Sequence, residues 1–178
     1  KFNIFYDLDK IIKKKIISYS KDIPLSEIRI LVAYSGGVDS SVLLYIIDKL
    51  SKELNFKYDF VYINHRMNPN DKYILMHADK FSDNHNSNFI YKEIIQTPRN
   101  NKESFFREFR YNYFNSLRIN NTYNFVFTAH HYNDQLETLY MKTLGQYDWT
   151  NLLGICEAKD FIRRPLLRIT KARIVNYA

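Results

Sequence analysis

Two glycines and three polar side chains stand together in one short stretch, Ser35-Gly36-Gly37-Val38-Asp39-Ser40. Apolar runs at 28–33 and 42–47 flank it, so the stretch joins a predicted strand to a predicted helix. The start of a helix carries unpaired backbone N–H groups at the positive end of its dipole, which favours phosphate oxygens. Glycines adopt positive φ and let a ligand approach the backbone closely. The stretch therefore predicts a phosphate-binding turn, and its alternative is an ordinary strand-to-helix turn.

The turn differs from the lysine-containing P-loop of many nucleotide-binding proteins. It lacks the G-x-x-x-x-G-K-S/T spacing, and the Asp39 carboxylate stands where the lysine would be. Mg²⁺ in proteins takes one or two carboxylates together with phosphate oxygens. We therefore expect the turn to hold a magnesium-bound pyrophosphate group, with the hydroxyls of Ser35 and Ser40 nearby.

A second cluster of chemically active side chains begins at His130, directly after the apolar run 125–129. On a helix, Asp134 lies four residues from His130 and three from Glu137, so the three groups share one face. Two carboxylates and an imidazole suit a second Mg²⁺, a substrate ammonium or general base catalysis. The alternative is a helix start whose acidic residues complement the dipole and whose histidines are hydrogen-bonded and partly buried.

The elements that position these groups alternate between strand and helix. We predict strands at 28–33, 60–63, 89–95 and 125–129, and helices at 6–20, from 42 onward, and at 71–84, 103–119, 132–144 and 171–178. This alternation predicts an α/β fold, with right-handed crossovers and a parallel sheet covered by helices on both faces. Ligands bind such sheets at the carboxyl ends of the strands. Ser35–Ser40, Asn64–Arg66 and the residues from His130 onward should therefore converge.

The composition narrows the class of protein. The chain has 178 residues, of which 46% are hydrophobic and 16% aromatic, so we expect one folded domain. A net charge of +7 favours a polyanionic partner such as nucleic acid, although a generally basic surface gives the same balance. No apolar run reaches the roughly 18 residues of a membrane span, and no signal sequence is apparent. We expect a cytoplasmic protein without a membrane partner.

Cysteine usage excludes one group of sites. The single cysteine, Cys156, excludes an internal disulfide and any Cys-x-x-Cys metal or cluster site. We expect Cys156 to be a small buried hydrophobic side chain.

Five ordered motifs resemble a known enzyme family. Residues 35–40 resemble the pyrophosphatase-loop signature of the ATP-pyrophosphatase (adenine nucleotide alpha hydrolase-like) superfamily, which has a Rossmann-like parallel sheet. Residues 130–138 resemble the H-H-x-D-D-Q-x-E-T motif of its tRNA(Ile)-lysidine synthetase branch. Residues 103–111 are similar to E-x-x-A-R-x-x-R-Y, 63–65 to the start of V-N-H-G, and 164–167 to R-P-L-L. The resemblance divides the chain into an amphipathic helix with its lead-in, 1–27, and a PP-loop ATP pyrophosphatase domain, 28–178, truncated at its C-terminal end.

Three positions depart from the pattern of this branch. Asn133 stands where the first Asp of the pair usually lies, Arg66 replaces the glycine after His65, and Leu144-Gly145 replaces Arg-Gly. Because Asn133 has no charge, Asp134 would have to supply any negative charge needed there. The family's downstream D-x-S-N and R-N-x-x-R elements and its C-terminal tRNA-binding domains are missing, which we attribute to truncation.

The resemblance implies an ATP-dependent ligase that forms a carbon–nitrogen bond. ATP would adenylate the wobble cytidine of the isoleucine tRNA with a CAU anticodon and release pyrophosphate. The ε-amine of free L-lysine would then displace AMP and leave lysidine. ATP and Mg²⁺ are the implied cofactors, the tRNA and lysine are the implied partners, and the protein is expected to be able to form a homodimer.

The resemblance and the motif chemistry together give each candidate residue a role. Asp39 would bind Mg²⁺ with Glu137, Asp134 and Glu137 would hold or deprotonate the lysine, and His130 or His131 would stabilise charge. Arg107 or Arg110 would bind a carboxylate or a phosphate, unless both pair with acidic residues on the solvent face of their helix. The residues expected to bind ATP are Ser35, Gly36, Gly37, Val38, Asp39, Ser40, Ile63 and Asn64, with adenine at the last two. The expected catalytic set is Asp39, His130, Asp134, Glu137, Arg107 and Arg110.

Three other functions fit some of the same residues. A tRNA thiolation enzyme of the same superfamily adenylates a base and then delivers sulfur, but such enzymes generally use cysteine pairs or a cluster, and this chain has Cys156 alone. An NAD- or GMP-synthetase-type amidating domain shares the turn but not the 130–138 motif. A non-catalytic nucleotide-binding module of the same fold would tolerate Asn133.

Overall fold

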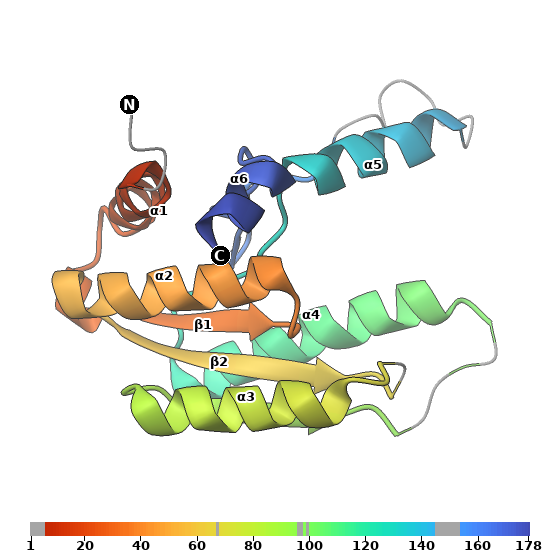
Figure 1. Ribbon diagram of the computed structural model, residues 1–178, viewed down its shortest axis with the longest axis horizontal. Helices are drawn as coiled ribbons and strands as arrows, with labels where there is room; N and C mark the ends of the chain where they lie inside the picture. The colour runs from red at the N-terminus through yellow and green to blue at the C-terminus, as the bar shows by residue number, and fades with distance from the viewer. Residues whose placement is uncertain (1–5, 67, 96–97, 99, 145–153) are drawn as a thin grey trace.

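The protein is an α/β domain built on one mixed sheet (Figure 1). The structure is a computed structural model that describes residues 6–66, 68–95, 98, 100–144 and 154–178. Within these residues, six strands form a sheet in the order β3-β2-β1-β4-β6-β5. The strands are β1 (Arg29–Tyr34), β2 (Lys57–Asn64), β3 (Phe89–Glu93), β4 (Phe125–Phe127), β5 (Ala158–Lys159) and β6 (Ile162–Arg163). The helices are α1 (Tyr6–Tyr19), α2 (Val38–Leu54), α3 (Asp71–Asn84), α4 (Lys102–Asn121), α5 (Tyr132–Leu144) and α6 (Lys171–Tyr177), with a 3₁₀ turn at Leu25–Glu27.

The central strands run parallel, as the alternation of strand and helix predicted. β1 pairs in parallel with β2 on one side and β4 on the other, so Val32 lies opposite both Phe60 and Phe127. The exception is the edge, where β5 and β6 form an antiparallel hairpin. Two-residue strands leave no periodic pattern in the sequence, and the sequence therefore did not predict this hairpin.

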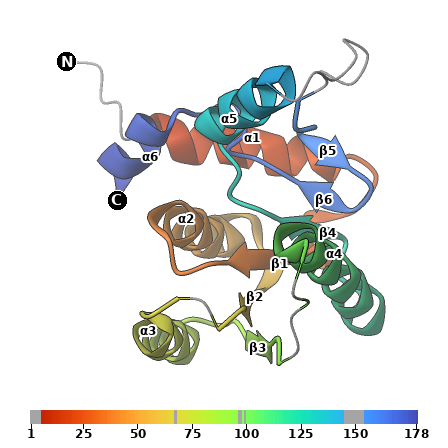
Figure 2. The same ribbon diagram turned by 90° about the vertical axis from the view of Figure 1, so that its right-hand side faces the viewer.

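Both faces of the sheet are covered by helices, which confirms the predicted layers (Figure 2). Alternate residues of β1 point to opposite faces, as a pleated strand requires. Ile30 and Val32 pack in the core formed with α1, α2, α3 and α6, whereas Leu31 packs in the core under α4. This double burial explains why β1 is almost continuously apolar.

The N-terminal helix α1 joins the larger of the two cores. Its side chains Leu8, Ile12 and Ile16 are buried and belong to the same cluster as β1 and α2. Of the three lysines between Ile12 and Ile16, Lys14 is exposed, whereas Lys15 forms a partly buried ion pair with Glu157 at 2.6 Å. None of the helices in the described part of the chain has the length and apolar composition that a membrane span requires.

The sheet topology places a crevice at one end of β1 and β4. After β1 the chain crosses to β2 and β3, whereas after β4 it continues on the opposite side to β6. The connections leaving these two strands therefore diverge, and such a switch point is where open α/β sheets bind ligands. The phosphate-binding turn follows β1, and the 130–138 motif follows β4.

Candidate active site

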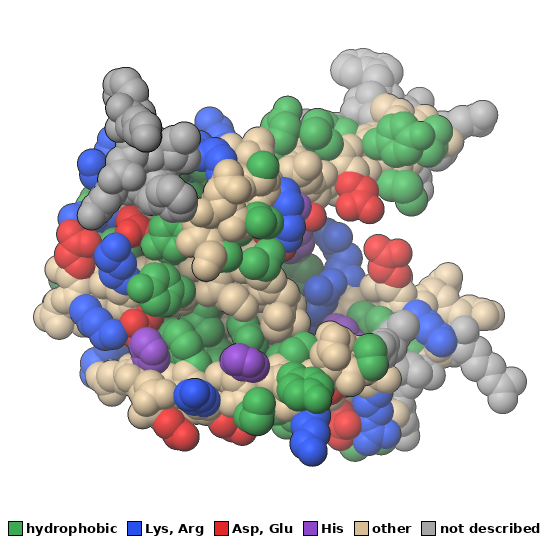
Figure 3. Space-filling view, viewed as in Figure 1, with side chains coloured by type: hydrophobic (Ala, Val, Ile, Leu, Met, Phe, Trp, Pro, Cys, Tyr) green, Lys and Arg blue, Asp and Glu red, His purple; other side chains and the backbone are tan. Residues whose placement is uncertain are grey.

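An open cavity of about 550 Å³ lies at this switch point. The carboxyl ends of β1, β2 and β4 form its floor, and α4 and the first turns of α2 and α5 form its sides. Figure 3 shows the molecule hollowed between the projecting helices α5 and α4. Eight predicted site residues line the cavity: Ser35, Asp39, Ser40, Ile63, Arg107, Arg110, His130 and Asp134. The predicted convergence of the turn with the 130–138 motif is therefore observed.

The glycine turn is held closed by its own serines. Ser40 Oγ donates to Gly37 O over 2.9 Å and accepts from the Ser35 N–H over 3.1 Å. Gly36 has φ +76°, and a Cβ there would lie 2.5 Å from the Ile74 side chain on α3. Gly37 is the N-cap residue of α2, and as a glycine it has no side chain to cap the helix. The first N–H groups of α2 are thus left without a capping side chain, as a phosphate site needs.

Asp39 is the acidic group of the turn, and only one of its oxygens is satisfied. Its Oδ2 accepts a hydrogen bond from Lys171 Nζ at 2.5 Å. Its Oδ1 is buried without a hydrogen-bond partner in the described residues. No group of three His, Cys, Asp or Glu side chains suited to a metal ion occurs in that part of the chain. Asp39 therefore fits a Mg²⁺ ion that takes its other ligands from phosphate oxygens and water, since Mg²⁺ rarely uses an all-protein cage.

The start of α5 is fixed by a reciprocal pair of hydrogen bonds. The His131 N–H donates to Asp134 Oδ2 over 2.7 Å, and the Asp134 N–H donates to His131 Nδ1 over 3.4 Å. This is the geometry of a capping box with histidine as its first residue. The other ring nitrogen of His131, Nε2, lies 3.7 Å from Asp39 Oδ2. His131 thus links the two halves of the site.

Asn133, the main departure from the resembled motif, has a structural contact outside the cavity lining. Its Oδ1 accepts the backbone N–H of Lys171, the first residue of α6, over 3.0 Å. An amide oxygen accepts this hydrogen bond as a carboxylate would. Because Asn133 has no charge, Asp134 is the acidic group of this pair, and Asp134 lines the cavity.

His130 is held in a neutral state. Its Nδ1 lies 2.8 Å from Thr128 Oγ1 at the end of β4. Burial lowers the pKa of His130 to about 4, and the positive charges of Arg164, Arg110 and Arg107 act in the same direction against the charge of Asp134. Near neutral pH, His130 therefore exchanges hydrogen bonds with a ligand rather than supplying a positive charge.

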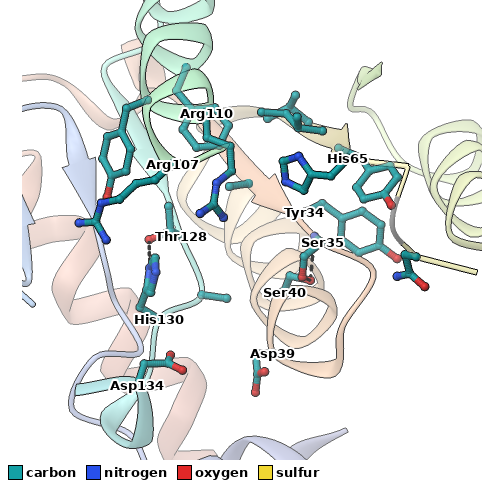
Figure 4. A pocket seen from close by; sticks show the side chains of 18 of the residues that line it. Tyr34, Ser35, Asp39, Ser40, His65, Arg107, Arg110, Thr128, His130 and Asp134 are labelled. Carbon is teal, nitrogen blue, oxygen red and sulfur yellow. Dashed lines mark hydrogen bonds between the residues drawn. The ribbon is translucent and has the colours of Figure 1, made fainter. Parts of the chain in front are cut away.

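The positive charge of the cavity comes from α4. Figure 4 shows Arg107 and Arg110 on the side opposite Asp39, with His130 between them and Asp134. Neither guanidinium pairs with a carboxylate in the described residues; Arg107 lies 5.6 Å from the Tyr111 ring centroid, and Arg110 Nε donates to Phe106 O over 3.4 Å. Desolvation by the cavity wall lowers the pKa of Arg110. Two unpaired cations are thus available for an anionic ligand, and the alternative of surface ion pairs is not observed.

Five predicted site residues do not line the cavity. Gly36, Gly37 and Val38 shape the turn without facing into it. The Asn64 side chain is buried and donates to Tyr91 OH over 3.3 Å, away from the lining. Glu137 is exposed one turn beyond Asp134, so the structure does not bring it together with Asp39 as a second metal ligand. The expectation that Cys156 is buried is wrong, because it lies exposed just before the edge strand β5.

Several contacts at the site had no assigned role in the sequence analysis. Arg164 of the R-P-L-L segment is buried, and its Nη2 donates over 2.8 Å to Tyr111 OH in the cavity wall. The His65 ring packs at a tilt against Phe106, with their centroids 4.5 Å apart, and burial lowers the pKa of His65. Both Arg164 and His65 lie in motifs that resemble those of the family, and that resemblance could have marked them as site residues. Lys171 lies in no motif that we identified.

Comparisons with known proteins agree with this geometry. The family described as the PP-loop domain matches residues 8–178. The tRNA(Ile)-lysidine synthase of Streptococcus thermophilus (strain CNRZ 1066) is 31% identical over 150 residues, covering 82% of this chain and 35% of the relative. That of Buchnera aphidicola subsp. Schizaphis graminum is 34% identical over 172 residues, covering 94% and 37%. The chain thus spans little more than a third of the length of these relatives.

A solved structure supports the fold. The U34-tRNA thiolase NcsA from Methanococcus maripaludis, described with its 4Fe-4S cluster, matches with a TM-score of 0.73 at 20% identity. The match covers 97% of this chain and 64% of that one. At this identity the likeness shows a shared fold, which agrees with the mostly parallel sheet described above.

Proposed function

Because this chain belongs to the PP-loop domain family, we propose that its cavity binds ATP with Mg²⁺ and uses the nucleotide to modify a tRNA. The similarity to tRNA(Ile)-lysidine synthases supports a more specific form of the proposal. In that form, lysine is joined to the wobble cytidine of the isoleucine tRNA with a CAU anticodon through an adenylated cytidine.

One observation carries the proposal: the glycine turn and the 130–138 motif open into the same cavity. The volume of about 550 Å³ falls in the range of small-molecule sites. The uncapped start of α2 offers donors to phosphate oxygens on one side, and Asp134 offers a carboxylate to an amine on the other. ATP and the amine of a second substrate would therefore meet between them.

The residues around the turn bind and orient the nucleotide in this proposal. Ser35 and Ser40 keep the turn closed, so the first N–H groups of α2 point at the phosphates. Asp39 holds Mg²⁺, which when bound offsets phosphate charge and favours the departure of pyrophosphate. Adenine lies at the end of β2, where it meets backbone groups around Ile63 and Asn64. Asn64 contributes through its backbone alone, since its side chain is engaged elsewhere.

The chemistry then proceeds in two displacements. The carbonyl oxygen at position 2 of cytidine attacks the α-phosphorus, and pyrophosphate leaves. The lysine ε-amine then attacks the ring carbon at position 2, and AMP leaves together with the former carbonyl oxygen. The attacking ammonium must first lose a proton, and Asp134 is the carboxylate in the cavity that accepts it. Arg107 and Arg110 bind the lysine carboxylate or a tRNA phosphate, and exposed Glu137, one turn beyond Asp134 on α5, attracts the ammonium.

The test is incorporation of labelled lysine into the isoleucine tRNA by the purified protein with ATP and Mg²⁺. Lysine incorporation together with ATP–pyrophosphate exchange is the expected result. Incorporation of cysteine-derived sulfur without lysine would replace the proposal by thiolation. Binding of ATP without exchange or incorporation would indicate a non-catalytic module. The expected homodimer is tested separately by sedimentation.

A further inference from the structure

The ammonium of Lys171 lies on the proposed metal ligand. Lys171 Nζ is 2.5 Å from Asp39 Oδ2, although the two residues are 132 positions apart in the chain. Neither the glycine turn nor the 130–138 motif contains this lysine. The contact therefore adds a cation to the phosphate side of the cavity, where the turn itself lacks the lysine of a P-loop.

The backbone of Lys171 is held by neighbouring elements, whereas its side chain is partly exposed. The backbone N–H is held by Asn133 Oδ1 at 3.0 Å, and Ile169 O accepts the Tyr132 N–H at 2.8 Å, so the start of α6 is tied to the start of α5. Ile174 buries α6 in the core that also contains α2. The Lys171 side chain, by contrast, is 39% exposed. Its ammonium can leave Asp39 without unpacking any part of the core.

Lys171 and a metal ion compete for the same carboxylate. A divalent cation that binds Asp39 would compete with Lys171 for Oδ2, because the ammonium already donates a hydrogen bond to that oxygen. The other oxygen, Oδ1, is buried and has no hydrogen-bond partner among the described residues. Two adjacent cations repel each other unless an anion lies between them. The phosphate oxygens of a bound polyphosphate would supply that anion and would accept hydrogen bonds from the displaced ammonium.

We propose that Lys171 is a polyphosphate-binding residue that pairs with Asp39 before a nucleotide binds and transfers to the phosphates when a divalent cation takes the carboxylate. This inference rests on the proposed binding of ATP in the turn. It gives the turn a lysine from a distant helix in place of the P-loop lysine it lacks. It also gives Asn133 a function, because Asn133 fixes the backbone from which that lysine extends.

The test uses Mn²⁺ in place of Mg²⁺, because free and bound Mn²⁺ are distinguished by electron paramagnetic resonance. Lys171→Met should bind Mn²⁺ alone more tightly than the wild type, since the competing ammonium is gone. The same variant should bind ATP in the presence of Mn²⁺ about 10- to 100-fold more weakly, as expected for the loss of a hydrogen bond between charged groups. Lys171→Arg should restore much of the nucleotide affinity. Lys13→Met, which removes an exposed ion pair with Glu53, is the matched control and should change neither measurement.

The opposite directions of the two effects separate this role from a structural one. A loss of folding would weaken binding of both Mn²⁺ and ATP, and circular dichroism of Lys171→Met and Lys171→Gln would reveal it. Unchanged ATP affinity in both variants, or weaker binding of Mn²⁺ alone by folded protein, would overturn the inference. If the wild type binds ATP through Lys171 but transfers no lysine to tRNA, the inference stands and the proposed function falls. If the wild type binds no ATP, both fall.

Discussion

At the scale of single residues, Asp39 is the group on which the proposed nucleotide site depends. Its Oδ1 is buried without a partner among the described residues, and its Oδ2 is held by Lys171 alone in a hydrogen bond. Asp39→Ala should therefore abolish ATP–pyrophosphate exchange, because no other carboxylate of the turn replaces it. The fold should survive, since substitutions in a surface cleft usually change stability little. ATP–pyrophosphate exchange at the wild-type rate in this variant would contradict the role of Asp39. Glu53→Gln, which removes a carboxylate from an exposed ion pair, is the control.

The two glycines of the turn differ in what they tolerate. Gly36 has φ +76°, and a Cβ there would meet Ile74 at 2.5 Å, whereas a Cβ on Gly37 would meet Ser35 Oγ at an ordinary 3.4 Å. We expect Gly36→Ala to lower the free energy of unfolding by about 1–3 kcal/mol through backbone strain and overpacking. Gly37→Ala should change it by less than about 0.5 kcal/mol. Urea denaturation of the two variants measures both values, and equal losses would contradict this account of the turn.

His130 makes stability depend on pH in a defined window. Its pKa is lowered to about 4, chiefly by burial, from an ordinary value near 6.5. The unfolded chain therefore binds a proton between these pH values that the folded protein does not. This contribution to stability is fully present above about pH 6.5 and is lost as pH falls toward 4, on the order of 3 kcal/mol in total. His130→Gln should flatten the corresponding part of a pH series of urea denaturations, and the exposed residue His77, changed to Gln, should leave it unaltered.

At the scale of elements, Asn133 tests how α5 and α6 are joined. Its Oδ1 caps the first N–H of α6. Asn133→Asp keeps an acceptor and adds a charge that suits a helix start, so it should retain stability and ATP–pyrophosphate exchange. Asn133→Ala should lower the free energy of unfolding by about 1 kcal/mol, the usual effect of losing such a cap. Loss of exchange in Asn133→Asp with retained stability would show that an uncharged residue is required there.

Two helices have the bounds that the sequence predicted. Helices α3 and α5 have the predicted bounds, Asp71–Asn84 and Tyr132–Leu144. Strand β2 begins three residues earlier than predicted, because Asp59 interrupts the apolar run. That carboxylate is buried and accepts hydrogen bonds from Tyr123 OH at 2.6 Å and the Asn88 N–H at 2.8 Å. The local sequence pattern cannot distinguish a buried aspartate, whose hydrogen-bond partners are distant in the sequence, from an aspartate in a loop.

In the site, too, local sequence patterns predicted some of the residues, whereas the tertiary fold alone brings the others into place. Ser35, Asp39, His130 and Asp134 follow strand ends, and parallel strands bring their carboxyl ends to one edge, so their convergence was predictable. Lys171 reaches Asp39 only because α6 packs beside α2. The lowered pKa of His130 likewise depends first on burial in the folded protein and then on the charge of Arg164, which lies in the loop before α6.

At the scale of the whole molecule, net charge should govern the proposed interaction with tRNA. The chain carries +7, yet Figure 3 shows lysines and arginines scattered among acidic side chains on the visible face rather than gathered in one stripe. Scattered charges attract a polyanion without selecting its sequence, because phosphate contacts position and base contacts specify. Residues 1–178 should therefore bind tRNA weakly, with an affinity that falls steeply as salt increases.

A titration of residues 1–178 in parallel with two tRNAs measures both properties. The CAU-anticodon isoleucine tRNA and an unrelated tRNA should bind with affinities within a few-fold of each other at low salt, and both affinities should decline together as salt is raised. Changing both Arg107 and Arg110 to Gln should reduce the salt dependence by roughly one or two released counterions if these cations contact phosphates. Tight and selective binding that resists salt would instead mean that these residues read tRNA bases directly, and the cavity rather than the general surface charge would then be the recognition site.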